Sequence, residues 1–416
     1  MFWLNLCSKS HNKTDMRRIL CSISIVLFLF TAACSNVNNQ KRNDETTIPT
    51  EAVVPRGAVP FEYRHHLYFN VLLRDSIPAR MVFDTGNTHL LIDSTFYATS
   101  IDDKSNLRRS MLRGAGGGVE IANIDAGGWK YRVGEKSQNE QMAVVMNLRK
   151  ILGGGVDGMF GMKCMQGERV EFNYADNYMR ILSADETISD DFTRIQCKWL
   201  DDSQMRILVP LSLAFGDGFA YEGEFMVDMG MSGSLSLNST IVDKLKQHLP
   251  EARSLIYTVG GVGGSRVDNV FKAQQVTIGN KTVKDVRAVW SGNKEGAMAD
   301  CRYDGVIGNE LLERYDIVCD FVECAIYTRP NRNFSAPQNN DLGIVLTPYS
   351  EYWIVNGLLQ GGNAEKAGLK RGDIIKSING IGADDERAKN LYPFPDKLQL
   401  SVQRGNSLIE IIFDKE

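Results

Sequence analysis

Short apolar runs, which alternate with polar residues or are rich in β-branched side chains, recur along most of the chain between Gly, Asn and Asp. Runs of this kind are typical of β-strands. Two of them, Tyr68–Leu73 and Ile207–Leu213, lead into segments in which an apolar stretch ends on an Asp that a Gly follows two positions later. Helical patterns are few and short. The pattern predicts a mostly antiparallel β protein.

The segments that contain these Asp residues belong to an internal repeat. Residues 81–92 read MVFDTGNTHLLI, and residues 226–237 read MVDMGMSGSLSL. Later, GVDGMFGMKC at 155–164 is echoed by RYDGVIGNEL at 302–311. A repeat at a fixed offset indicates a duplicated structural unit.

The offset between matching features is nearly constant, so we expect two sibling lobes, one over residues 56–190 and one over residues 191–330. Hairpin-like sequences, VEFNYADNYMRIL in the first half and IVCDFVECAIYTR in the second, extend the match. The separations are 144 residues from Asp84 to Asp228, 147 from Asp157 to Asp304, and 147 from Phe172 to Cys319.

The repeat predicts a pair of carboxyl groups. If the lobes pack about a pseudo-two-fold axis, Asp84 and Asp228 meet at that axis. Two carboxylates about 3 Å apart cannot both ionise, so they share a proton and titrate as a unit. One can take a proton from water while the other gives a proton to a peptide carbonyl, as in the pepsin dyad. This chemistry needs no cofactor and no metal.

Four short segments resemble the signature of aspartic peptidases: two Asp loops, and two apolar-apolar-Gly turns. Their order matches retropepsin-like domains fused in tandem over about residues 56–330. The resemblance implies two acid-protease-type β-barrel lobes that form a bilobal cleft, a peptide or protein substrate, and a monomeric active unit. It also implies catalysis by Asp84 and Asp228, with Thr85, Gly86, Gly230, Gly161 and Gly308 in the supporting loops. The segments are Asp84-Thr85-Gly86, Asp228-Met229-Gly230, Met159-Phe160-Gly161 and Val306-Ile307-Gly308.

The second Asp loop departs from the family pattern. In the family, the Thr of each Asp-Thr-Gly loop hydrogen-bonds across the lobe interface. Thr85 can do so and Met229 cannot, which costs on the order of 1 kcal/mol if the apolar side chain packs well. Met229 therefore keeps open a second interpretation, a catalytically weak or inactive peptide-binding pseudo-protease. A third is an envelope adaptor that uses neither aspartate.

A Gly-rich tract follows each Asp loop, RGAGGG at 113–118 and VGGVGG at 259–264. The first resembles the glycine-rich flap of retroviral enzymes, which closes over a peptide backbone. The alternative is an ordinary hairpin tip. The candidate flap residues are Gly114, Gly116, Gly117 and Gly118.

Other polar residues near these loops are expected to be structural. Asp157 and Asp304 each precede a Gly, a setting in which Asp often bonds its own backbone. His65, His66 and His89 are expected at the surface. Cys319 and Cys324 flank a hairpin-like turn, where a disulfide and free buried thiols are both compatible with the sequence.

The N-terminus has the features of an export signal. Two arginines precede an apolar run of about a dozen residues and then small residues, which predicts a signal peptide over residues 1–33, with Met16 as an alternative start. Cys34 resembles the cysteine of a bacterial lipoprotein box; the alternative is an ordinary signal with an incidental cysteine. Polar residues 34–55 are expected to form a flexible tether. These features favour a lipid-anchored protein of the bacterial cell envelope.

The last eighty residues resemble a PDZ domain, a small β-sandwich with short helices, over about residues 335–416. Residues 363–369, NAEKAGL, match its short helix, and residues 371–375, RGDII, match the next strand. Such domains capture peptide C-termini in a backbone loop. The resemblance places that loop at Leu342, Gly343 and Ile344.

Composition narrows the choice of partners. The chain has 416 residues, 43% of them hydrophobic, with 47 basic and 51 acidic residues and a net charge of -4. This balance does not favour sequence-independent binding to phosphates, so no nucleic-acid partner is expected. The sequence as a whole favours an exported aspartic-type endopeptidase with a peptide-binding C-terminal domain.

Overall fold

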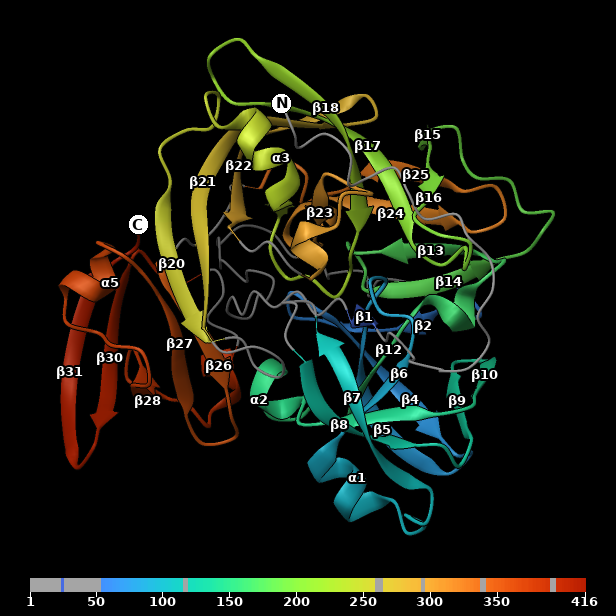
Figure 1. The fold of residues 1–416 in the computed structure, drawn as a ribbon, viewed down its shortest axis with the longest axis horizontal. Helices are drawn as coiled ribbons and strands as arrows, with labels where there is room; N and C mark the ends of the chain where they lie inside the picture. Colours follow the sequence, from blue (N-terminus) through green and yellow to red (C-terminus); the bar gives the residue numbers. More distant parts are fainter. Residues whose placement is uncertain are drawn as a thin grey trace, which may run out of the picture.

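The computed structural model describes residues 24–25, 54–114, 119–258, 265–292, 296–336, 342–389 and 394–416. Strands dominate these residues, and the helices are short. Two lobes of similar topology lie one above the other, and a third, C-terminal unit lies beside them (Figure 1). The expected fold class, mostly β with two similar lobes, is confirmed.

Lobe 1 is built mainly from hairpins; in the strand LYFNVLL, Asn70 is exposed while the residues on either side of it are buried. A two-residue strand, β1 (Ser24–Ile25), pairs with its edge. The elements of lobe 1 are β2 (Val59–Pro60), β3 (Glu62–Tyr63), β4 (Leu67–Leu73), β5 (Ile77–Phe83), β6 (Leu90–Asp93), α1 (Ser94–Ser100), β7 (Leu107–Gly114), β8 (Val119–Asp125), β9 (Trp129–Val133), β10 (Lys136–Glu140), β11 (Ala143–Met146), α2 (Arg149–Leu152), β12 (Gly158–Phe160), the 3-10 helix η1 (Met162–Met165), β13 (Arg169–Asn173) and β14 (Tyr178–Leu182).

Lobe 2 repeats this order with longer central strands. Its elements are β15 (Thr193–Gln196), β16 (Lys198–Trp199), β17 (Ile207–Ala214), β18 (Ala220–Val227), β19 (Leu235–Leu237), α3 (Ser239–Leu245), β20 (Arg253–Thr258), β21 (Ser265–Ile278), β22 (Lys281–Ser291), the 3-10 helix η2 (Ala297–Ala299), β23 (Gly305–Ile307), α4 (Asn309–Leu312), β24 (Tyr315–Asp320) and β25 (Ala325–Pro330).

The same three-residue register occurs at the centre of both lobes. Residues 81–83 of β5 pair in parallel with 158–160 of β12, and residues 225–227 of β18 pair in parallel with 305–307 of β23. The strand after each Asp loop, β6 or β19, then pairs antiparallel with the same partner. The sequence repeat is therefore a structural repeat, and the chain leaves β5 and β18 at equivalent points.

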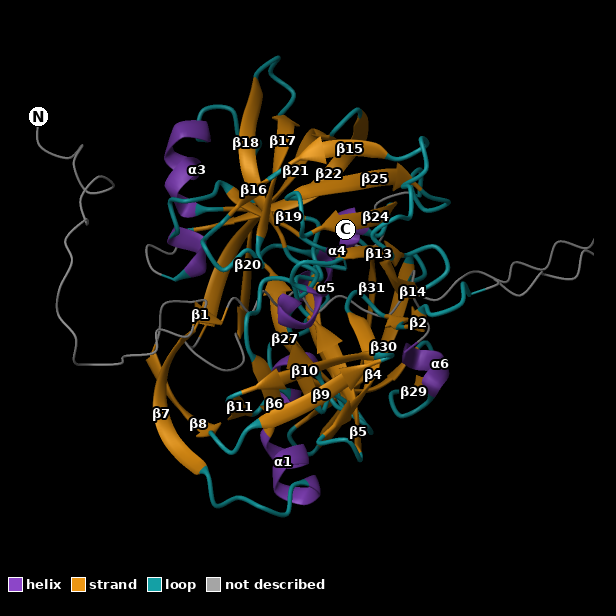
Figure 2. Cartoon of the chain, turned by 90° about the vertical axis from the view of Figure 1, so that its right-hand side faces the viewer, coloured by secondary structure: helices purple, strands orange, loops and turns teal. Residues whose placement is uncertain are grey.

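A six-stranded sheet joins the lobes. Its order is β15-β25-β24-β13-β14-β2, so that β13 of lobe 1 and β24 of lobe 2 are central neighbours. They pair antiparallel, with Phe172 opposite Ile317 and Val170 opposite Cys319. The side view in Figure 2 shows these strands between the two lobes. Residues of both lobes share one hydrophobic core, so the lobes are packed as one body.

The C-terminal unit has its own core, which includes the fully buried Trp353, Ile375 and Val402. The segment expected to be helical forms α5, and Asn379 and Gly380 have positive φ in the turn after β28. The elements are β26 (Ile344–Pro348), β27 (Trp353–Leu359), α5 (Asn363–Lys366), β28 (Ile374–Ile378), β29 (Ile381–Gly382), α6 (Glu386–Lys389), β30 (Lys397–Arg404) and β31 (Ser407–Asp414).

This unit is bonded to both lobes. β27 continues the sheet of lobe 2 by pairing with β20, where Leu255 lies opposite Leu359. Arg253 at the start of β20 forms an ion pair with Glu416, with 2.7 Å between its Nη1 and Oε2. On the other side, the amide of Gly154 in lobe 1 donates to the carbonyl of Pro348 over 2.8 Å. The C-terminal unit thus bridges lobe 1 and the β20–β21 hairpin.

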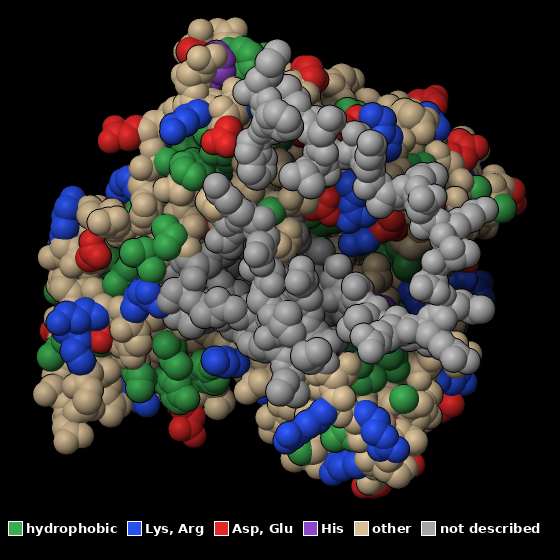
Figure 3. All heavy atoms as spheres, in the orientation of Figure 1, with side chains coloured by type: hydrophobic (Ala, Val, Ile, Leu, Met, Phe, Trp, Pro, Cys, Tyr) green, Lys and Arg blue, Asp and Glu red, His purple; other side chains and the backbone are tan. Residues whose placement is uncertain are grey.

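Cys319 and Cys324 are buried free thiols, so the disulfide alternative is not realised in this structure. Among the described helices, none is long and apolar enough to cross a membrane. The face in Figure 3 mixes Lys and Arg with Asp and Glu rather than presenting one basic surface.

Candidate functional site

The two predicted aspartates occupy equivalent turns directly after β5 and β18. The amide of Asp84 donates to the carbonyl of Phe160 over 3.0 Å, and the amide of Asp228 donates to that of Ile307 over 2.9 Å. Each turn closes in the same way, because the Asp carbonyl accepts the amide three residues later at 3.2 Å. Each Asp is thereby anchored to the parallel neighbour of the strand that it follows.

The carboxyls of Asp84 and Asp228 lie side by side at the lobe interface. Each Oδ1 accepts two amides of its own loop, the amide two residues later at 2.8 Å and the next at 3.1 Å. A Cβ atom on Gly86 would lie 3.0 Å from Oδ2 of Asp228 and 3.2 Å from Oδ1 of Asp84. Within the described residues, neither Oδ2 accepts a hydrogen bond from a group outside the pair. The Oδ2 atoms are thus the oxygens left for chemistry.

Burial and mutual interaction hold protons on this pair. Both side chains are 0% exposed. Burial raises the pKa of Asp84 to about 7, although hydrogen bonds from Asp228 and from the loop amides oppose the rise. Burial, followed by the charge of Asp84 and the hydrogen bond to it, raises the pKa of Asp228 well above its usual range. Because the two groups titrate together, the pair retains a proton near neutral pH.

One side chain crosses from lobe 1 to hold the second loop. Thr85 Oγ1 donates to the carbonyl of Val227 and accepts the amide of Met229, both over 2.8 Å. Met229 is fully buried in the shared core and makes no equivalent bond in return. The sequence-based expectation for Thr85 and Met229 agrees with this geometry.

The two supporting glycines leave no room for a side chain. A Cβ on Gly161 would lie 1.7 Å from the carbonyl oxygen of Asn87, and one on Gly308 would lie 2.3 Å from that of Gly233. Gly230 is equally restricted, since its Cβ would lie 2.2 Å from Cγ of Asp84. These contacts tie each apolar-apolar-Gly turn closely to the neighbouring Asp loop.

Asp157 and Asp304 each accept a hydrogen bond from a strand of their own lobe. Rather than bonding its own backbone, Asp157 accepts the amide of Arg80 in β5 over 3.0 Å, and Asp304 accepts that of Glu224 in β18 over 2.8 Å. Each carboxylate therefore fixes the strand that leads to Asp84 or Asp228.

The prediction that the histidines lie at the surface is wrong for two of them. His65 is 2% exposed and His66 is 5% exposed, because the chain turns inward before β4 and packs against lobe 2. Burial, and then the neighbouring His65, lower the pKa of His66 to about 3, so it is neutral. His89 is half-buried.

Sequence reasoning missed Asn309, the first residue of α4. Its side chain is fully buried and donates through Nδ2 to the carbonyl of Met229 over 2.6 Å and to that of His65 over 2.7 Å. A signal was present: Asn309 directly follows the repeated glycine Gly308, at the position that Met162 occupies after Gly161.

The remaining candidates lie elsewhere. Gly114 ends β7, which forms an antiparallel hairpin with β8, whereas Gly116, Gly117, Gly118 and Cys34 lie outside the described residues. In the C-terminal unit, Leu342 is buried, Gly343 has a φ of 64°, and Ile344 begins β26.

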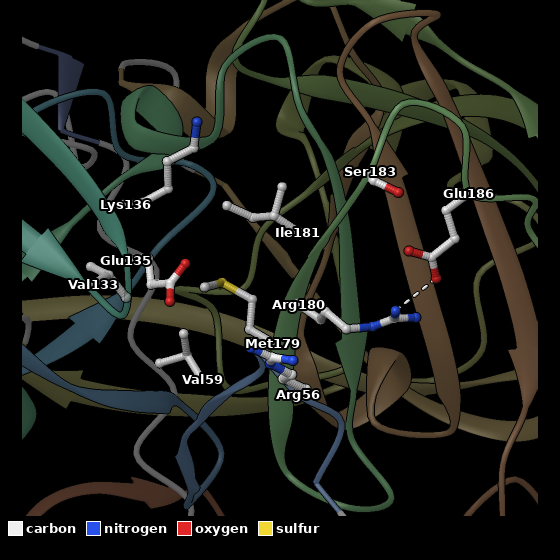
Figure 4. Close-up of a pocket in the computed structure, with 11 residues that line it drawn as sticks. Arg56, Val59, Val133, Glu135, Lys136, Met179, Arg180, Ile181, Ser183 and Glu186 are labelled. Atoms are coloured by element: carbon white, nitrogen blue, oxygen red, sulfur yellow. Dashed lines mark hydrogen bonds and ion pairs between the residues drawn. The ribbon is translucent and has the colours of Figure 1, made fainter.

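A cavity of about 380 Å³ lies away from the Asp loops, between residues 56–59, the β9–β10 turn and β14 (Figure 4). An ion pair between Arg180 and Glu186 borders it. None of the predicted site residues lines it. The lining residues are Arg56, Gly57, Val59, Val133, Glu135, Lys136, Met179, Arg180, Ile181, Ser183 and Glu186.

Comparison with known proteins gives a likeness in structure but none in sequence. No protein-family model matches the sequence, and no curated protein matches it. Among solved structures, the aspartic proteinase from Irpex lacteus is similar, with 13% sequence identity and a TM-score of 0.43, over 68% of this chain and 99% of that chain.

Proposed function

We propose that the chain is an aspartic-type endopeptidase that hydrolyses peptide bonds in peptides or proteins. The observation that carries this proposal is the Asp84–Asp228 pair. Two carboxyls from equivalent turns lie together, fully buried, with raised pKa values, and each has one oxygen held by loop amides. A shared proton and two differently committed oxygens are what acid–base hydrolysis requires.

The proposed reaction uses water and the pair alone. The ionised carboxyl takes a proton from water as the water oxygen bonds to the peptide carbonyl carbon. The protonated carboxyl gives its proton to the carbonyl oxygen, which yields a neutral tetrahedral diol. The carboxyl that took the proton from water then gives it to the peptide nitrogen while the other carboxylate takes a proton from one diol hydroxyl. The C–N bond breaks, an amine and a carboxylic acid are released, and the pair again holds one proton. Because Asp84 and Asp228 are 0% exposed, substrate entry requires an opening step, which we assign to the β7–β8 hairpin as flap.

The C-terminal unit is proposed to bind peptide C-termini in the manner of a PDZ domain. Among the described strands, β26 pairs only with β27, so its other edge can accept an added strand. The loop at Gly343 lies beside a carboxylate, because a Cβ there would lie 2.7 Å from Oε1 of Glu416. That oxygen also accepts the amide of Asn363 over 2.5 Å. Because two carboxylates repel one another, a bound terminal carboxylate would have to displace the Glu416 side chain from this position.

We further propose export and lipid anchoring through Cys34 in a bacterial cell envelope. This rests on the charged, apolar and small-residue order of residues 16–34. Intact mass of the protein purified from membranes tests it: a diacylglyceryl adduct on Cys34 is expected, and an unmodified cysteine would contradict the anchor.

The peptidase proposal is tested by digestion of a peptide library, read by mass spectrometry, with the parent, Asp84→Asn and Asp228→Asn. Both variants keep the shape of the side chain and are expected to lose cleavage by at least about 10³-fold. Asp102→Asn, an exposed Asp of lobe 1, is the matched control and should cleave as the parent does. Undiminished cleavage by either dyad variant would refute the proposal.

Met229 favours a second candidate, a peptide-binding protein with little or no turnover. Each Asp loop can contribute one hydroxyl that crosses the lobe interface, and here only Thr85 does so. In that case the parent would bind library peptides without cleaving them, and Met229→Thr would gain no turnover. Measurable turnover by the parent that Asp84→Asn abolishes would exclude this candidate.

A further inference from the structure

The two Asp loops are held unequally, and the inequality points to an additional residue. Thr85 reaches from lobe 1 to two backbone groups of lobe 2, the carbonyl of Val227 and the amide of Met229. Met229 cannot reciprocate. If Thr85 were the only side chain that held the second loop, it would bond the amide of Met229 but not the carbonyl of Met229.

The carbonyl at the other end of this residue is held by Asn309. Its Nδ2 donates to Met229 O over 2.6 Å and to His65 O over 2.7 Å, and its Oδ1 accepts the hydroxyl of Tyr174 over 2.7 Å. Two carbonyls need two N–H donors, so only this orientation of the amide satisfies all three partners. Burial raises the pKa of Tyr174 well above its usual value, which keeps its hydroxyl a donor.

The repeat explains why this arrangement is specific to lobe 2. After the supporting glycines, lobe 1 has Met162 and lobe 2 has Asn309, at the offset of 147 residues that other features share. At the loop position after each Asp, the order is reversed: lobe 1 has Thr85 and lobe 2 has Met229. Each lobe therefore has one hydrogen-bonding residue and one Met at these two positions.

We propose that Asn309 is a positioning residue that supplies a second contact between the lobes, in place of the one that Met229 cannot make, and holds Asp228 against Asp84 through the Met229 carbonyl. Tyr174 and the His65 carbonyl orient its amide and tie it to lobe 1. The peptide chain around Asp228 is thereby held at Val227 and at both backbone groups of Met229.

The inference rests on the proposed function for its kinetic test. Asn309→Leu, which keeps volume and removes all three hydrogen bonds, is expected to lower kcat about 100-fold with KM nearly unchanged. Tyr174→Phe, which removes one hydroxyl, should lower kcat about 10-fold. The matched control is Tyr178→Phe, because Tyr178 is a buried lobe 1 tyrosine whose hydroxyl bonds Asn173 and Glu171. It should keep parental kcat.

Two readouts separate positioning from mere stability. A loosened Asp228 interacts less with Asp84, so the two apparent pKa values of the pair should move toward each other in ¹³C-carboxyl NMR titrations of Asn309→Leu. Adding Met229→Thr to Asn309→Leu restores a hydroxyl at the loop position and should recover at least about 10-fold in kcat.

The outcomes are distinct. Unchanged carboxyl pKa values together with a kcat loss that Tyr178→Phe matches would overturn the positioning role. If Asn309→Leu does not fold, the same comparison is made between Tyr174→Phe and Tyr178→Phe. If Asp84→Asn cleaves like the parent, the peptidase proposal fails, while the NMR titration still decides whether Asn309 sets the geometry of the pair.

Discussion

A single methyl group at Gly230 should separate the two carboxyls. The Cβ of Gly230→Ala would lie 2.2 Å from Cγ of Asp84 and 2.5 Å from both of its carboxyl oxygens. Real Cβ atoms essentially never approach another heavy atom within 3.0 Å, so either the Asp84 carboxyl or the lobe 2 loop must shift by at least about 0.8 Å. The Asp84 carboxyl cannot shift freely, because the amides of Gly86 and Asn87 hold its Oδ1.

This displacement sets the expected size of the effect. Misplacing a reacting group by about 1 Å can cost about 10²-fold in rate, and inserting a methyl group into a packed site typically costs about 1–3 kcal/mol of stability. Gly230→Ala should therefore lower kcat at least about 100-fold while the protein stays folded. In Gly86→Ala the added Cβ would lie 3.0 Å from Asp228 Oδ2, which requires a shift of only a few tenths of an ångström, so the loss of activity should be smaller.

The assay is steady-state cleavage of one library-derived peptide, with urea unfolding of each variant alongside. Gly292→Ala is the control, because this exposed glycine has no atom within 4 Å of an added Cβ and its φ is not positive. Equal activity of Gly230→Ala and Gly292→Ala would refute the close approach of the carboxyls. A loss in Gly86→Ala as large as in Gly230→Ala would refute the graded geometry.

Three other perturbations have defined outcomes. The pKa of Asp84 is raised to about 7 from an unfolded value near 3.9, so the folded state binds a proton more tightly than the unfolded chain does. The free energy of unfolding should therefore decrease as pH rises from about 4 through about 7. In urea titrations at pH 4 and pH 8, Asp84→Asn should make this decrease smaller by on the order of a few kcal/mol. Gly161→Ala, whose Cβ would lie 1.7 Å from Asn87 O, should destabilise the protein by about 3 kcal/mol or more, and a thermal midpoint equal to the parent's would contradict the contact. Arg253→Ala removes the half-exposed cation from the buried Glu416 carboxylate and should cost about 1–3 kcal/mol. It should also increase amide exchange in β20 and β27, and unchanged exchange would contradict the contact.

The features that the sequence predicts well are those that repeat within it. Asp84 and Asp228 end apolar strands that lead into tight turns, so their local setting is legible in a dozen residues each. The constant offset then implies that the turns are equivalent, and in the structure both lie in the same register beside β12 and β23. Gly161 and Gly308 are predicted as supports by the resemblance of their turns to those of aspartic peptidases.

Features that depend on packing between distant segments could not be predicted in this way. His65 and Asn309 are 244 residues apart in the sequence, yet they are packed together and hydrogen-bonded in the buried interface between the lobes. No local pattern distinguishes an inward-turning histidine from an exposed one. The addition of β27 to β20 is of the same kind, since strand edges pair through backbone groups that carry no sequence signature.

The contacts that fix the geometry of the Asp84–Asp228 pair lie at the interface between the two lobes. Every bond that fixes the peptide around Asp228 from outside its own lobe ends on a lobe 1 group: Thr85 directly, and Tyr174 and the His65 carbonyl through Asn309. Burial, and then the charge of Asp84 across the interface, raise the pKa of Asp228. The geometry of the pair is therefore a property of the lobe interface rather than of either lobe. Because the central β13–β24 pairing holds the same interface, a substitution there should disturb the carboxyl pair as well as the fold.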